Sequence, residues 1–169
     1  YLTINKICKA LEGLPLALEI VAAKTASLSV SQIYERLHQK LRISDNKRDR
    51  DKKHKTLEQT IDWSYNLLTK KEQEVFLQTS LFKDGFTLEA VEAIIEVDDI
   101  EIFELADLIG SLVEKSLLRV NITEGTTRYD MYVAINDYVR GKLPKVKNKD
   151  YIKQYILRFA SYFQSYCSK

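Results

Sequence analysis

The residues of this chain whose types and spacing could hold a ligand are Gly13, Leu14, Pro15 and Leu16. They separate two apolar stretches that are both spaced like helices. Gly13 can end the first helix with a positive φ, and Pro15 suits the first turn of the next one, where its missing N–H costs nothing. A rigid ring would then lie at an exposed helix start, beside unpaired backbone N–H groups. Such a corner can receive a ligand, or it can simply join two helices.

No other group of residues is spaced for catalysis or for metal binding. His38 and His54 are the only histidines, and no Ser/His/Asp or Cys/His arrangement can be assembled. Cys8 and Cys167 lie at opposite ends of the chain, without the spacing of a metal site or a redox pair. The phosphate-binding pattern GxxxxGK[ST] is also absent from the sequence. We therefore expect a chain that is not an enzyme, binds no metal and works in the reducing cytoplasm.

The composition predicts a mainly helical, globular chain. Apolar residues make up 45% of the 169 residues and charged residues 30%, with only five glycines and two prolines. A net charge of +2 gives no general attraction to nucleic acid or to anionic lipid. No apolar run reaches the roughly 18–20 residues of a membrane-spanning helix. Since the sequence begins without Met, we expect a segment of a longer protein.

The first half of the chain predicts a small helical domain followed by a linker. Residues 1–44 carry the corner at Gly13 and two or three helices with apolar residues at helical spacing. Residues 45–55 contain no apolar residue, and six of the eleven are Lys or Arg. Because acidic residues are interleaved, a solvated charged linker is the favoured interpretation, with a nucleic-acid patch as the alternative.

The second half predicts a winged helix-turn-helix at residues 56–144. Capping-box patterns at Thr56 and Thr69 each open a helix, and two further helices follow. Two short strands on either side of a turn at residues 124–127 then predict a β-hairpin wing.

A last helix is predicted within residues 145–169, as the start of an α-helical repeat region. Its aromatic residues recur every three or four positions, which indicates one buried face. We expect little in this chain to cover that face, which would favour self-association or a neighbouring helix. The stripe consists of Tyr151, Tyr155, Phe159, Tyr162 and Tyr166.

Taken in order, five strings resemble the middle of STAND-type signalling ATPases, the NB-ARC or AP-ATPase-like class that includes bacterial AfsR-like and MalT-like regulators. The resemblance covers nearly the whole chain. The strings are residues 13–19 (GLPLALE), 54–68 (HKTLEQTIDWSYNLL), 81–90 (LFKDGFTLEA), 112–118 (LVEKSLL) and 128–140 (RYDMYVAINDYVR).

The resemblance implies a role in nucleotide binding. In that family an upstream P-loop domain holds ADP or ATP with Mg, and this chain would bind no cofactor alone. Gly13, Leu14, Pro15 and Leu16 would contact the adenine and ribose edge. The implied partners are the chain's own upstream nucleotide-binding domain and a downstream helical sensor, with oligomerisation on activation, no membrane contact, and no nucleic acid through this segment.

A second implied contact departs from the family pattern. Where animal and plant members place Met-His-Asp, with His at the β-phosphate of ADP, this chain has Met131, Tyr132 and Val133. Tyr132 keeps a hydrogen-bonding hydroxyl but does not become cationic near neutral pH. Tyr132 is therefore the candidate phosphate sensor, and an ordinary hairpin or core aromatic is the alternative.

The leading prediction is thus a regulatory module that clasps the ADP-bound nucleotide domain and swings on nucleotide exchange. A DNA-binding winged helix is one alternative. Against it, residues 96–115 carry seven acidic residues and a single lysine, so that phosphates would be repelled. A purely structural scaffold for protein interactions is the other alternative.

Overall fold

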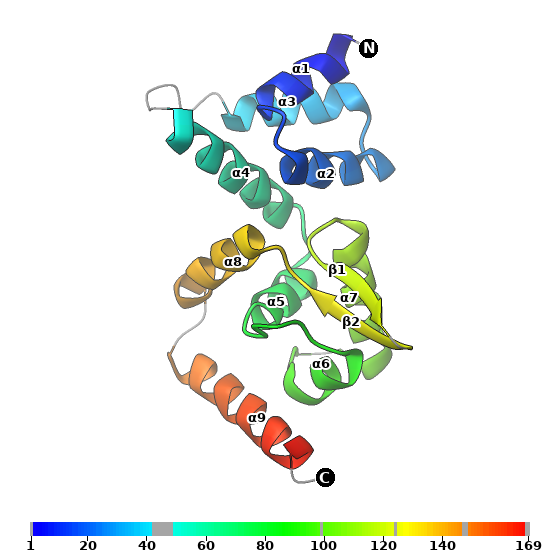
Figure 1. Cartoon of the computed structure of the whole chain (residues 1–169), viewed down its shortest axis with the longest axis vertical. Coiled ribbons are helices and arrows are strands. Elements are labelled where there is room, and N and C mark those ends of the chain that lie inside the picture. The colour runs from blue at the N-terminus through cyan, green and yellow to red at the C-terminus, as the bar shows by residue number, and fades with distance from the viewer. Residues whose placement is uncertain (1, 42–48, 99, 124, 147–148, 168–169) are drawn as a thin grey trace. The chain divides into compact units, whose positions relative to one another are not determined.

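The computed structural model describes residues 2–41, 49–98, 100–123, 125–146 and 149–167, and Figure 1 shows its helices and strands. Within these described residues the chain is mainly helical, with one antiparallel pair of strands and a C-terminal helix. This confirms the predicted fold class. The contacts divide the chain into two compact units, Tyr1–Leu68 and Thr69–Lys169, which are described separately below.

The first unit is helical throughout its described residues. Its elements are α1 (Leu2–Ala10), α2 (Pro15–Ala23), a short 3-10 turn η1 (Lys24–Ala26), α3 (Val30–Leu41) and α4 (Asp49–Asn66). Helix α1 packs on α3, and both α2 and α3 pack on α4. The core that joins them consists of Ile7, Leu11, Ala17, Val21, Ile33, Leu37 and Trp63.

Helix α4 corrects two predictions. Residues 49–55 form its first turns rather than part of a linker, because Lys and Arg favour helices and the side chains of Lys53 and Lys55 are exposed. The rest of the predicted linker, residues 45–48, lies outside the described residues. The helix also carries Trp63 into the core of the first unit, so the boundary falls between Leu68 and Thr69 and not at residue 56.

The predicted capping box at Thr56 is accordingly wrong. Thr56 lies inside α4, where its hydroxyl donates to Oε1 of Glu12 at 3.2 Å. Its carbonyl accepts a hydrogen bond from the hydroxyl of Thr60 at 2.7 Å. The local pattern has no capping role because the helix has already begun seven residues earlier.

The second unit is a winged helix with two further helices. It contains α5 (Lys70–Thr79), α6 (Leu88–Ile94), α7 (Ile102–Glu114), β1 (Arg119–Thr123), β2 (Thr126–Asp130), α8 (Val133–Val146) and α9 (Lys149–Cys167). Helix α5 packs on α7 and α8, while α6 contacts α7 and β2. Strands β1 and β2 pair antiparallel, with Arg119 opposite Asp130 and Thr123 opposite Thr126.

Local signals fix two boundaries in this unit. Thr69 caps α5 in a full capping box with Glu72, as predicted, and Thr87 caps α6 through the N–H of Ala90. Ahead of α6, Gly85 has a φ of 79°, and a Cβ there would lie 2.7 Å from the carbonyl oxygen of Tyr129. This close approach lets Phe86 and Tyr129 exchange two backbone hydrogen bonds of 2.8 Å, which adds a bridge beside the wing.

Helix α9 is covered more fully than the sequence suggests. It packs on α6, and Tyr155 is only 1% exposed. The ring centroids of Phe159 and Phe82 are 5.4 Å apart. Residues 149–167 therefore belong to the second unit instead of forming a separate region, because α6 supplies the missing surface. Part of α9 stays apolar and exposed at Ile156 and Leu157. The side chain of Tyr166 lies outside the described residues.

Candidate functional site

The predicted corner at Gly13 forms in the first unit through two residues with positive φ. Glu12 and Gly13 have φ angles of 54° and 65°. The N–H of Gly13 donates to the carbonyl of Cys8 at 3.1 Å, and that of Leu14 to Leu11 at 3.0 Å. These bonds close α1 and turn the chain into α2. The predicted positive φ of Gly13 is confirmed, whereas that of Glu12 was not expected.

Pro15 is exposed at the first position of α2. The preceding Leu14 is extended, with φ −67° and ψ 116°, and gives no side-chain cap. The first turn also contains no acidic residue, so its backbone dipoles meet no negative side chain of that turn. Leu14 packs against the core, and Leu16 is half-buried. The corner therefore presents an apolar ring next to a helix start that no side chain caps.

Tyr132 lies where β2 leads into α8 in the second unit. Its carbonyl accepts hydrogen bonds from the N–H groups of Ile135 and Asn136, both at 2.9 Å, and so begins the helix. The guanidinium of Arg119 lies over its ring, 4.2 Å from the centroid. Arg119 also donates to Asp130 at 2.6 Å, and this hydrogen bond raises the pKa of Arg119. Tyr132 thus has a structural role at the hairpin.

The structure surrounds Met131 and Val133 with charges that the sequence analysis did not single out. Both residues line a cavity of about 510 Å³ between the loop before α6, the wing and α8. Its charged residues are Lys83, Asp84, Arg119, Asp130, Asp137 and Arg140. These residues come from the loop before α6, from the wing and from α8. No local sequence motif contains them, and they meet only because the chain folds.

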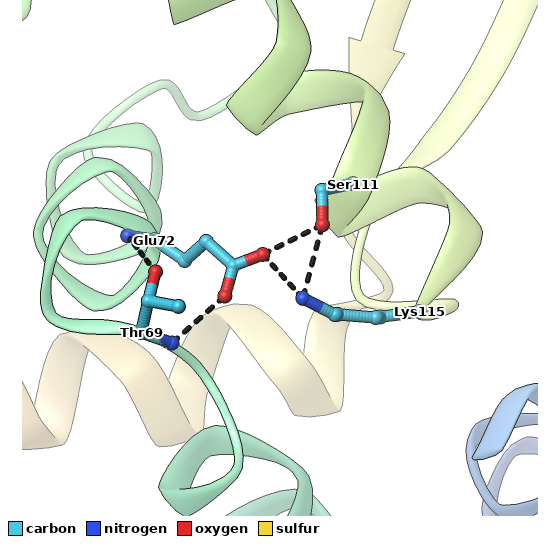
Figure 2. A network of polar contacts seen from close by, with 4 residues as sticks. All are labelled: Thr69, Glu72, Ser111 and Lys115. Atoms are coloured by element: carbon cyan, nitrogen blue, oxygen red, sulfur yellow. Dashed lines mark hydrogen bonds and ion pairs between the residues drawn. The ribbon is translucent and has the colours of Figure 1, made fainter. Parts of the chain in front are cut away.

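A buried polar network joins the start of α5 to the end of α7 (Figure 2). The carboxylate of Glu72 accepts hydrogen bonds from the hydroxyl of Ser111 at 2.6 Å, from Nζ of Lys115, and from the N–H of Thr69 at 2.8 Å. Burial opposes ionisation of Glu72, but these hydrogen bonds outweigh it and lower its pKa to about 2. The Glu72 side chain is 5% exposed, and the network ties α5 to α7 inside the second unit.

The exposed face of α7, which lies within the acidic stretch of residues 96–115, is acidic. It presents Phe103, Glu104, Asp107, Gly110 and Glu114. The lysines next to it are already engaged, since Lys71 pairs with Glu104 at 3.1 Å and Lys115 binds Glu72. On the wing, Arg128 donates to the carbonyls of Asp84 and Gly85. This distribution opposes the docking of a DNA backbone along α7.

The described residues contain neither a metal site nor a membrane-spanning helix. No group of three or more His, Cys, Asp and Glu residues within them is placed to hold a metal ion. None of the helices in the described part is both long and apolar enough to cross a membrane.

The chain is similar to segments of longer mycobacterial proteins. No family model matches the chain. A protein of Mycobacterium tuberculosis that carries the provisional name HTH-type transcriptional regulator is 36% identical over 141 residues, and a Mycobacterium bovis protein with the same provisional name matches equally. The match covers 83% of this chain but only 16% of those relatives.

A second kind of relative is less informative about function. An uncharacterised protein of Mycobacterium tuberculosis is 29% identical over 150 residues, or 88% of this chain and 38% of that protein. The chain is therefore similar to one segment of longer mycobacterial proteins, some of which are named as transcriptional regulators.

Proposed function

We propose that this chain is a segment of a transcriptional regulator. The observation that carries the proposal is the winged helix of the second unit, together with 36% identity to proteins provisionally named as HTH-type transcriptional regulators. Those relatives are named as regulators and not as enzymes, which supports a non-catalytic segment. Two mechanisms are open for it, direct contact with DNA and nucleotide-dependent regulation within a longer protein.

Direct DNA contact is the mechanism that the names of the relatives favour. The charges of the second unit limit how it could occur, because α7 presents Glu104, Asp107 and Glu114 to solvent. Binding would instead use the lysines and arginines of residues 47–55 in the first unit.

The test is a titration of labelled duplex DNA with the full chain at several salt concentrations. If this mechanism holds, binding weakens steeply with salt and is lost when the lysines and arginines of residues 47–55 are changed to Gln. Absence of binding at low salt, with the fold intact by circular dichroism, would exclude this mechanism for the segment.

Nucleotide-dependent regulation is the second mechanism, and the corner at Gly13 favours it. The exposed ring of Pro15 and the helix start without a side-chain cap fit an adenine edge, which is flat and offers hydrogen-bond acceptors. Gly13, Leu14 and Leu16 would complete the contact. ADP or ATP with Mg would be held chiefly by an upstream domain of the longer protein, and Tyr132 would lie near the phosphates.

The test is a titration of fluorescent ADP with the intact parent protein, its Pro15→Ala variant and its Tyr132→Phe variant. We expect Pro15→Ala to weaken ADP retention severalfold while the unfolding midpoint changes little. The control is Ser31→Ala, a substitution at an exposed position away from the corner, which should leave ADP retention unchanged. Identical ADP release from the parent and from Pro15→Ala would rule out the adenine contact.

A further inference from the structure

A groove in the second unit lies between α6 and α7, and neither proposed mechanism uses it. We name it the α6–α7 groove. It has a volume of about 280 Å³. Its floor is apolar, because Ile95 and Leu105 are almost fully buried beneath it, and half-buried Val97 and Ile100 also line it. The groove is at the small end for small-molecule sites and suits one or two side chains better.

The rim of the α6–α7 groove is acidic and largely available. Glu92 from α6, Asp98 from the connecting loop and Glu101 at the start of α7 line it and are exposed. Among the described residues, no lysine or arginine forms a salt bridge with these three carboxylates. The fourth rim carboxylate, Glu96, is paired with Arg158 of α9 at 2.7 Å.

The charges around the groove select its occupant. Arg158, which pairs with the rim carboxylate Glu96, is further engaged because it donates to the carbonyl of Ile94. Three exposed carboxylates above an apolar floor attract lysine or arginine and repel phosphate. Nucleic acid is therefore disfavoured here, and a metal ion finds no suitable group of ligands among the described residues.

We propose that the α6–α7 groove binds a Lys/Arg-rich protein segment that inserts one aliphatic side chain. The aliphatic side chain lies on Ile95 and Leu105, and the flanking cations pair with Glu92, Asp98 and Glu101. The winged helix then uses this face for protein contact. The proposal depends on neither DNA contact nor nucleotide binding.

The experiment measures fluorescence anisotropy of a labelled peptide, Lys-Arg-Lys-Leu-Lys-Arg-Lys, against the full chain. We expect saturable binding that the triple variant Glu92→Gln, Asp98→Asn, Glu101→Gln weakens at least about fivefold. A matched triple variant, Glu35→Gln, Glu58→Gln, Glu114→Gln, removes the same charge from exposed positions outside the groove. It should change the affinity by less than about twofold.

A second arm separates the floor from the rim. Replacing the central leucine of the peptide by serine should weaken binding to the wild-type chain at least about fivefold, because the apolar contact is lost. Binding of the serine peptide should still weaken as the salt concentration rises, because its cationic side chains still pair with the rim carboxylates. Equal affinity for the leucine and serine peptides would show that the floor is not occupied, and would overturn the proposal.

Two further results would also overturn it. Equal weakening by the two triple variants would reduce the effect to net charge alone. Direct binding of labelled duplex DNA to the full chain that is lost in the rim triple variant would assign this face to nucleic acid instead. If the rim variant has a lowered melting midpoint by circular dichroism, Glu92→Gln and Asp98→Asn are tested singly, each with an expected loss of about twofold.

Discussion

At the scale of single residues, Glu72 shows how one carboxylate can serve two functions in the fold. Its side chain accepts the N–H of Thr69 and so completes the cap of α5. The same carboxylate accepts hydrogen bonds from Ser111 and Lys115 at the C-terminal end of α7 (Figure 2). The cap is local, but Ser111 and Lys115 follow Glu72 by 39 and 43 residues, so only folding brings them together.

The pKa of Glu72 leads to a prediction about acid stability. Since the pKa is lowered to about 2 in the folded chain, the ionised form stabilises the fold at all pH values above the unfolded pKa near 4.5. This contribution should fall as the pH drops from about 4.5 towards 2. Glu72→Gln should therefore lower the free energy of unfolding by about 2–3 kcal/mol at pH 7, and by much less at pH 2.5.

Urea unfolding of the wild type and of Glu72→Gln at pH 7, 4 and 2.5 provides the measurement. Glu35→Gln, at an exposed position of the first unit, is the control and should change stability by less than about 0.5 kcal/mol throughout. A difference between wild type and Glu72→Gln that does not depend on pH would contradict the lowered pKa.

At the scale of secondary-structure elements, the packing of α9 on α6 decides how much of the C-terminal part is held in place. The contact combines aromatic and polar groups. Phe159 packs against Phe82, while Arg158 donates to the carbonyl of Ile94 and pairs with Glu96. Tyr151 adds a hydrogen bond to Glu74 at 3.1 Å. The opposite face of α9, with Ile156 and Leu157, stays exposed.

This asymmetry predicts unequal effects of two alanine substitutions on the same helix. Phe159→Ala should cost about 2–3 kcal/mol, because it removes a large ring from a packed surface. Leu157→Ala should cost less than about 0.5 kcal/mol, since that side chain is 60% exposed. Chemical denaturation of both variants checks this. Equal costs would mean that α9 does not use its Phe159 face to pack against Phe82.

At the scale of the whole molecule, the two units have separate internal organisation. The first unit has a core built around Leu11, Leu37 and Trp63, the only tryptophan in the chain. The second unit has its own buried groups, among them Phe76, Val91 and Leu112. Each unit thus buries enough apolar surface to protect its own backbone amides from hydrogen exchange.

We accordingly predict that a core substitution acts mainly within its own unit. Leu37→Ala should destabilise by about 2–5 kcal/mol and increase amide hydrogen exchange in α1 to α4 more than in α5 to α9. Trp63 fluorescence should follow the same loss. Phe76→Ala is the matched substitution in the second unit, with the reverse expected pattern. Uniform loss of protection across both units in either variant would indicate a single cooperative unit.

The features that could be predicted from the sequence are those whose causes are local. Gly13 and Pro15 predicted the corner between α1 and α2, because each residue restricts or frees its own backbone. Thr69 predicted the start of α5 for the same reason, since its cap reaches only to Glu72. The two predicted strands formed the wing around their turn. The mainly helical fold class follows from such local signals.

The tertiary structure decided what depended on distant partners. The pattern at Thr56 looks like the one at Thr69 but is buried inside α4, because Trp63 holds that helix in the core of the first unit. The cover of α9, the partners of Glu72 and the acidic rim beside α7 also require contacts between residues far apart in the sequence. Such contacts depend on packing and register, which neither composition nor local spacing contains.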